Sequence, residues 1–128
     1  MRRARVLNLS KHTALAERAE IASNFWTRGV GLLGRSDWSR ADGLIIRPCS
    51  SIHCLFMTLT IDAVFVGSDD LVLRLAPGLR PWTLGVIAPG AQYVIELPPG
   101  TLARAGTEQG DRVVIEIAPD PGAPTASK

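Results

Sequence analysis

The sequence predicts an α+β fold, with a mainly antiparallel, strongly curved β-sheet or partly open barrel and one or two short helices. Eight segments show the hydrophobic patterns of strands, most with a period of two, whereas only one segment is clearly helical. Clusters of glycine, proline and aspartate separate the segments. A chain of 128 residues fits one domain. We expect this domain to span residues 1–118, with the Pro/Ala/Gly-rich residues 119–128 forming a disordered tail.

The first part of the chain is expected to form two strands and a helix. Residues 3–9 alternate loosely, and we favour a strand over residues 15–22, although their Ala- and Glu-rich composition also suits a short helix. Ser23 or Asn24 can cap the following helix, which Gly34 ends. Two arginines share one face of that helix, Arg28 and Arg35.

The rest of the chain reads mainly as short strands. They cover residues 43–47, two segments within 49–66, residues 71–76 after a hairpin turn, and residues 93–97 and 112–117. Residues 98–100 precede a brief helix over 101–105, since proline is tolerated in a first turn. We expect this fold to have a core of apolar strand residues, namely Ile45, Leu55, Phe56, Phe65, Leu73, Ile95 and Ile115.

Alternation assigns directions to side chains of the last two strands. It turns Tyr93 inward and Glu96 outward, onto a face that we expect to be solvated. If Glu96 turned inward instead, it would be a second carboxylate near Asp62. In the final strand the pattern points Ile117 inward, together with Val113.

Composition excludes several classes of protein. With 46% hydrophobic and 20% charged residues the chain differs from disordered chains, and its net charge of +2 is too small to imply a nucleic-acid partner. No apolar stretch reaches the ~20 residues of a membrane span. The N-terminal residues lack the apolar core of a signal peptide. We therefore expect a cytoplasmic protein.

The longest apolar segment, residues 49–67, contains polar residues that need an explanation. If His53 lies beside Asp62 on the neighbouring strand, the two form an oriented imidazole suited to ligand binding or proton transfer. Alternatively, His53 makes a buried structural hydrogen bond. Asp62 could also bond backbone amides at a strand bend, or pair with Arg28 or Arg35.

The same segment contains residue types that bind soft metals, namely Cys49, His53, Cys54 and Met57. In an extended strand Cys54 points away from His53 and Met57, so we expect no metal and no cofactor. The two cysteines are five positions apart, which disfavours a disulfide. Reduced thiols agree with a cytoplasmic location.

Several short sequence blocks occur in an order that resembles the domain of unknown function 192 family. They are Arg28–Arg35, Gly43–Ile46, Ser51–Phe65, Pro81–Trp82, Tyr93–Gly100 and Gly110–Asp111. The resemblance implies a small β-rich α/β domain of bacterial and archaeal proteins, without an established activity or catalytic residues. An aromatic residue or threonine often follows the histidine in this family, whereas this chain has Cys54, which argues against a thiol-dependent family function.

Two functions of different classes are consistent with these residues. The first is a non-enzymatic binding domain with a polar cleft for a small anionic ligand or a peptide segment, lined by Arg28, Arg35, His53, Asp62 and Trp82. The second is a hydrolase-like acid/base enzyme that uses His53 and Asp62. We favour the binding domain, because the sequence offers the enzyme no convincing nucleophile, second carboxylate or metal, and it contains no nucleophile elbow, phosphate loop or zinc-ribbon pattern.

Overall fold

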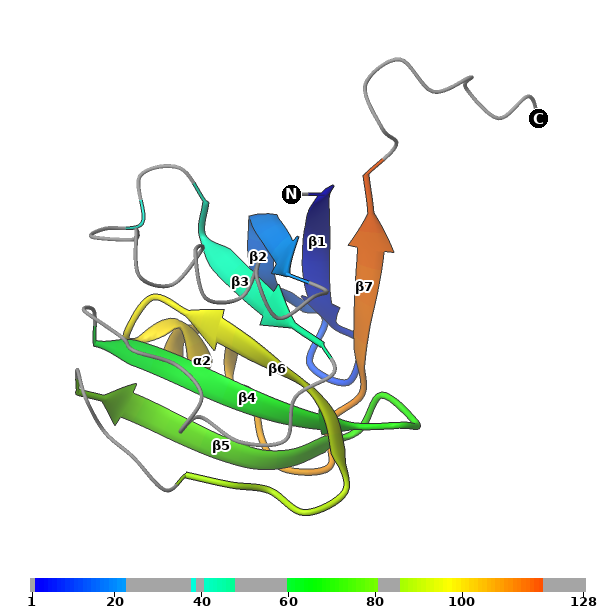
Figure 1. Cartoon of the computed structure of the whole chain (residues 1–128), viewed down its shortest axis with the longest axis vertical. Helices are drawn as coiled ribbons and strands as arrows, with labels where there is room; N and C mark the ends of the chain where they lie inside the picture. Colours follow the sequence, from blue (N-terminus) through cyan, green and yellow to red (C-terminus); the bar gives the residue numbers. More distant parts are fainter. Residues whose placement is uncertain (1, 23–37, 39–40, 48–59, 81–85, 119–128) are drawn as a thin grey trace.

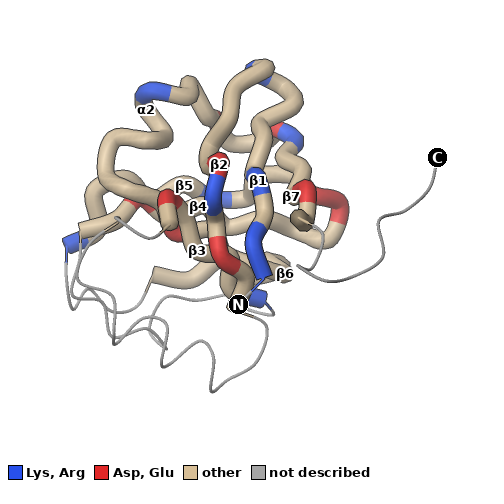
Figure 2. Tube along the Cα trace, turned by 90° about the horizontal axis from the view of Figure 1, so that it is seen from above, with Lys and Arg blue, Asp and Glu red and all other residues tan. Residues whose placement is uncertain are grey.

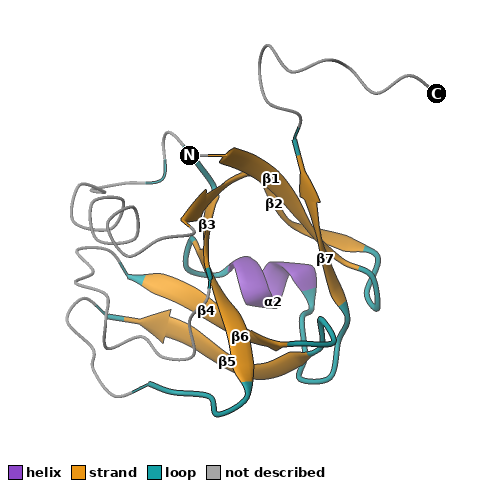
Figure 3. Ribbon diagram, turned by 45° about the vertical axis from the view of Figure 1, so that its right-hand side comes forward, coloured by secondary structure: helices purple, strands orange, loops and turns teal. Residues whose placement is uncertain are grey.

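The computed structural model describes residues 2–22, 38, 41–47, 60–80 and 86–118. These residues form one strongly curved sheet and a short helix, which lies on the inner side of the curve (Figure 1, Figure 3). The elements are β1 (Arg2–Asn8), β2 (Thr13–Ala22), β3 (Gly43–Ile46), β4 (Ile61–Gly67), β5 (Val72–Leu79), β6 (Ala91–Leu97), α2 (Thr101–Ala105) and β7 (Val113–Ile117). The predicted helix over residues 101–105 is confirmed.

The sheet is mixed and mainly antiparallel. Its strand order is β5-β4-β6-β3-β2-β1-β7. The β2–β3 pair is parallel, and the other neighbouring strands are antiparallel. The prediction of a curved sheet with short helical content is therefore confirmed in its main features, with one parallel pair added. The helix expected after Ser23 or Asn24 lies outside the described residues.

Backbone contacts join the beginnings of the two edge strands, β5 and β7. Leu71 forms an isolated antiparallel bridge with Arg112. The Val72 amide donates a 2.8 Å hydrogen bond to the Asp111 carbonyl, and the Gly110 amide donates one of 2.8 Å to the Val72 carbonyl. These bonds draw the sheet toward closure at one end, which matches the expected partly open barrel.

Both faces of the central strands are buried, because alternate residues enter different cores. On the helix face, which carries α2, Val64 and Ile95 pack with Leu102 of the helix. On the opposite face, Phe65 and Val94 belong to a second apolar cluster. Double burial explains why residues 61–66 read as an almost continuous apolar run.

The predicted core is confirmed at Ile45, Phe65 and Ile95, which are fully buried. Leu73 and Ile115 are partly buried and pack against the two cores, while Leu55 and Phe56 lie outside the described residues. The prediction that the Ile117 side chain points inward was wrong. Its exposure is 40%, because it ends the edge strand β7 beyond the core.

Residues of both charge signs occur along the neighbouring strands β2, β1 and β7, at one edge of the sheet (Figure 2). Arg5 of β1 pairs with Glu17 of β2 at 2.7 Å and with Glu116 of β7 at 3.3 Å. Opposite charges therefore meet across these neighbouring strands. No helix in the described part of the chain is long and apolar enough to cross a membrane.

Candidate functional site

Asp62 is an enclosed carboxylate that binds backbone amides. It is 1% exposed, near the start of β4. Its Oδ1 atom accepts a hydrogen bond of 2.9 Å from the Gly78 amide, and its Oδ2 atom accepts bonds of 3.0 Å from the amides of Gly100 and Leu102. The alternative in which Asp62 bonds backbone amides is confirmed.

These contacts give Asp62 a clear structural role. The first amides of a helix lack partners within the helix itself. No side chain adjacent to α2 caps it, and Gly100 at its N-cap has a φ of 92°. Asp62 therefore replaces the local cap from a strand that precedes the helix by about forty residues.

Glu96 is buried, contrary to the prediction of a solvated side chain. It is 1% exposed and pairs in register with Ala63 of β4 and Leu44 of β3, which both belong to the cluster on the opposite face. The prediction failed because β6 is a central strand with both faces covered. Asp62 pairs with Leu97, which faces α2, so the two carboxylates occupy different sides of the sheet.

Most of the expected cleft falls outside the described residues. This applies to Arg28, Arg35, His53 and Trp82, and also to the sulfur-containing residues Cys49, Cys54 and Met57. Of the residues proposed from the sequence to bind a ligand, the structure describes Asp62, whose oxygens face backbone amides. Within the described ranges, no three His, Cys, Asp or Glu side chains gather in a way that could hold a metal ion.

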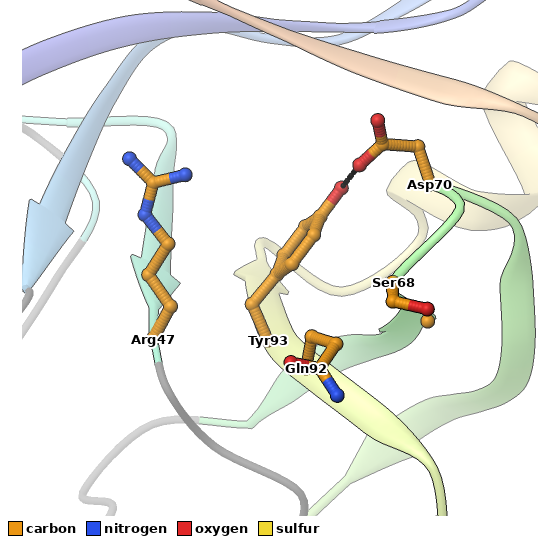
Figure 4. Close-up of a pocket in the computed structure, with 6 residues that line it drawn as sticks. Arg47, Ser68, Asp70, Gln92 and Tyr93 are labelled. Atoms are coloured by element: carbon orange, nitrogen blue, oxygen red, sulfur yellow. Dashed lines mark hydrogen bonds between the residues drawn. The ribbon is translucent and has the colours of Figure 1, made fainter.

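A polar pocket lies at the far end of β4 from Asp62. It has a volume of about 380 Å³ and is open to solvent. Three segments build it: the residue after β3, the turn between β4 and β5, and the start of β6. The lining residues are Arg47, Gly67, Ser68, Asp70, Gln92 and Tyr93 (Figure 4).

Strand register explains why these segments meet. Tyr93 pairs with Val66 of β4, and Ile46 of β3 pairs with Val94. One further step of the antiparallel register brings Arg47 opposite Tyr93. By alternation Arg47 lies on the same face of the sheet as Ile45, the face that carries α2. Because β3 ends at Ile46, the Arg47 side chain lies at the edge of the core on that face.

Tyr93 and Asp70 form the fixed part of the pocket. The Tyr93 hydroxyl donates a 2.9 Å hydrogen bond to Oδ1 of Asp70. Burial raises the pKa of the Tyr93 phenol well above its ordinary value, and the bond to Asp70 and the charge of Asp70 raise it further. The positive charge of Arg47 acts in the opposite direction, so both charged groups are close enough to influence the phenol.

The other polar side chains of the pocket make no hydrogen bond to one another or to other described residues. Arg47 is half-buried, yet among the described residues its guanidinium makes no hydrogen bond or ion pair. The same holds, within that part of the chain, for the side chains of Ser68 and Gln92, which are exposed. Arg47 thus offers a positive charge flanked by neutral hydrogen-bonding groups.

Sequence reasoning missed this pocket, although signals for it were present. Arg47 directly follows the fully apolar strand residues 43–46, and Tyr93 is the only tyrosine of the chain. A charged residue at the end of a buried strand is a candidate for a rim position. Its relation to Asp70 depends on long-range pairing, which local patterns do not reveal.

A second polar cluster joins β1 to the turn before β7. The Asn8 side chain donates hydrogen bonds to Thr107 Oγ1 at 3.1 Å and to Asp111 Oδ2 at 2.9 Å. Lys11 donates to Asp111 Oδ1 at 2.8 Å, and the Glu108 amide donates to Oδ2 at 2.9 Å. This cluster is closed by its own contacts, which indicates a structural role.

Comparison with known proteins gives a consistent result. The model of the DUF192 family, described as an uncharacterized ACR, matches residues 6–115. A UPF0127 protein of Pyrococcus abyssi is 33% identical over 111 residues, which cover 84% of this chain and 94% of that protein. A UPF0127 protein of Thermococcus sibiricus is 33% identical over 116 residues, covering 88% of this chain and 75% of that protein.

A solved structure shares the fold. The crystal structure of a protein of unknown function from Novosphingobium aromaticivorans matches with a TM-score of 0.67 and 25% sequence identity. The match covers 88% of this chain and 83% of that chain.

Proposed function

Since the chain belongs to the DUF192 family, we propose that this family member is a non-enzymatic binding domain, which holds a small anionic ligand beside Arg47. The match confirms the resemblance inferred from the sequence blocks. Residues Arg47, Ser68 and Gln92 would contact the ligand, and Tyr93 would form the wall behind it.

The state of Arg47 carries this proposal. A guanidinium is permanently charged, and taking it partly out of water costs free energy unless an anion compensates. No described residue supplies that anion to Arg47. A ligand carboxylate or phosphate can, because guanidinium binds such groups in bidentate fashion.

The size of the pocket fits a small molecule. A volume of about 380 Å³ lies near the lower end of the range for small-molecule sites. Because the pocket is open, the ligand would stay partly solvated, and we expect weak to moderate affinity. An acidic side chain of a peptide segment offers the same anionic group and is the alternative occupant.

The enzyme alternative receives less support from the described residues. A hydrolase that uses His53 and Asp62 needs the carboxylate to orient the imidazole. Three backbone amides already bind the Asp62 oxygens, which favours a structural role for this residue. The expected cleft lined by Arg28, Arg35, His53 and Trp82 remains a prediction for the undescribed segments.

The proposal is tested by titrating the labelled protein with acetate, and with phosphate in a second series, at constant ionic strength, while amide chemical shifts are recorded. Saturable shifts should concentrate at Arg47, Ser68 and Gln92, and Arg47→Gln should abolish them. Arg18→Gln, which changes an exposed arginine of β2, is the matched control. Equal binding by wild type and Arg47→Gln would refute the proposal.

A further inference from the structure

We infer that the ligand is a small zwitterion, whose acidic group meets Arg47 and whose cationic group meets Asp70. This inference rests on the proposed function and names the class of ligand. Figure 4 shows the guanidinium and the carboxylate on either side of the Tyr93 side chain, within one pocket. The site therefore presents both signs of charge to one small molecule.

Asp70 has acceptor capacity left for a ligand. Its Oδ1 atom accepts the Tyr93 hydroxyl, and Oδ2 accepts no hydrogen bond from the described residues. The residue is exposed at the tip of the β4–β5 turn. An ammonium group entering from solvent can thus reach Oδ2 without displacing Tyr93.

The backbone at this position does not require a carboxylate. Asp70 has a φ of 63°, a left-handed conformation that glycine and asparagine adopt at least as readily as aspartate. The amide oxygen of an asparagine could also accept the Tyr93 hydroxyl. What aspartate adds is the negative charge, which faces the pocket.

This charge selects among ligands. A simple anion at Arg47 gains the guanidinium contact but is repelled by Asp70, whereas a zwitterion gains from both groups. A simple cation has the reverse difficulty. Discrimination by an added repulsive group is a common means of specificity.

A ladder of ω-amino acids tests the inference directly. Glycine, β-alanine, γ-aminobutyrate, δ-aminovalerate and ε-aminocaproate carry the same two charges at increasing separation. Valerate and pentylammonium serve as matched compounds with one charge each. Dissociation constants come from amide shifts of the wild-type protein at constant ionic strength, so the main comparison needs no variant.

The best member of the ladder should bind roughly fivefold more tightly than valerate, as about 1 kcal/mol for an exposed ion pair implies. Asp70→Asn should remove this preference while leaving valerate binding equal or stronger. Arg47→Gln should weaken the binding of both the ω-amino acid and valerate. A glycylglycine titration distinguishes a free amino acid from a peptide as the source of the two charges.

Three results would overturn the inference, and they differ in whether the proposed function survives. If valerate binds the wild type as tightly as every ω-amino acid, the ligand is a simple anion, and the proposed function stands without the zwitterion. If no compound of either kind shifts the pocket amides, the proposed function fails as well. Retention of the zwitterion preference in Asp70→Asn would also exclude the assigned role of Asp70.

Discussion

Asn8 and Asp111 lie at opposite ends of the sequence, and their side chains are joined by a 2.9 Å hydrogen bond. Asp111 is 5% exposed and accepts further bonds from Lys11 and from the Glu108 amide. The cluster fastens the first strand to the turn before the last one. One carboxylate therefore holds together residues that are far apart in the chain.

Replacing this carboxylate should destabilise the fold. Asp111→Ala leaves the Glu108 backbone amide without its acceptor and removes one of two acceptors each from the Asn8 side chain, which keeps Thr107, and from Lys11, which keeps Glu108. We expect a loss of about 2–4 kcal/mol in the free energy of unfolding. Urea denaturation measures it. Glu116→Gln, which breaks an exposed ion pair with Arg5, is the control and should cause no measurable loss. Equal effects of both changes would contradict the prediction.

The same residue should make stability depend on pH in the acid range. Burial alone favours the neutral acid, but the bonds from Asn8, Lys11 and the Glu108 amide outweigh it and hold the pKa of Asp111 below its usual value. The resulting stabilisation is present above the unfolded pKa of about 3.9 and is lost as pH falls through the lower folded pKa.

Denaturation of wild type and Asp111→Asn at several pH values checks this sign. The difference in unfolding free energy between the two proteins should be largest near neutral pH and should shrink below about pH 4. A difference that stays constant into strong acid would show that the ionised carboxylate is not what stabilises the cluster.

Asp62 should contribute strongly to stability, although it forms no ion pair with a described residue. Asp62→Ala leaves the amides of Gly78, Gly100 and Leu102 unsatisfied in a buried position, which should cost roughly 3 kcal/mol or more. Asp62→Asn keeps one oxygen and should have an intermediate effect. Hydrogen exchange at Leu102 should accelerate in the same order. Unchanged exchange in Asp62→Ala would argue against the capping role.

Tyr93 offers a direct optical test, because it is the only tyrosine. Burial and Asp70 raise the pKa of the Tyr93 phenol above its value of about 10 in the unfolded chain. The neutral phenol therefore contributes its full stabilisation below the unfolded pKa, and this stabilisation is lost as pH rises through the folded pKa. Phenolate absorbance should therefore appear later in the native protein than in urea. Asp70→Asn should shift ionisation of the folded protein to lower pH. Coincident native and denatured titrations would refute the buried contact.

Gly43 marks a close approach of strands β2 and β3. A Cβ atom at this position would lie 3.1 Å from the Ala16 Cβ atom, 3.2 Å from Leu97 Cδ2 and 3.3 Å from the Ala19 Cβ atom. Gly43→Ala should thus destabilise by roughly 1–3 kcal/mol through overpacking. Adding Ala16→Gly removes the nearest atom and should recover part of the loss in a double-mutant cycle. Strict additivity of the two changes would show that they do not share this space.

Local patterns predicted most of the elements in the described part of the chain, whereas the helix expected after Ser23 or Asn24 and the strand expected to end at Met57 lie outside it. The strand over residues 15–22 and the helix over 101–105 follow from alternation and from the proline and glycine residues before the helix. Alternation failed at Glu96, because it assumes that one face of a strand meets water, whereas both faces of β6 are covered from Tyr93 to Leu97. It failed at Ile117 because the edge strand extends past the core.

The candidate site was harder to predict, because the residues that form it are far apart in the sequence. The sequence offered Asp62 several partners, and the choice depended on where α2 begins, in a later segment of the chain. The pocket beside Arg47 requires three segments in a particular register. Such pairing is set by the whole sheet. A single sequence therefore indicates the residue types of the site but not which of them lie close together.

The position of β1 between β2 and β7 has a consequence for synthesis on the ribosome. The β1–β2 hairpin is made first, but the partner for the other side of β1 is about a hundred residues later, in register with Ala4 at Ile117. At ordinary elongation rates this delay lasts roughly 5–20 s. Throughout that time the backbone amides and carbonyls along one side of β1 have no strand partner and can pair with another nascent chain. Arginines at positions 2, 3 and 5 place like charges along that open edge, and their mutual repulsion between chains disfavours such pairing until β7 arrives.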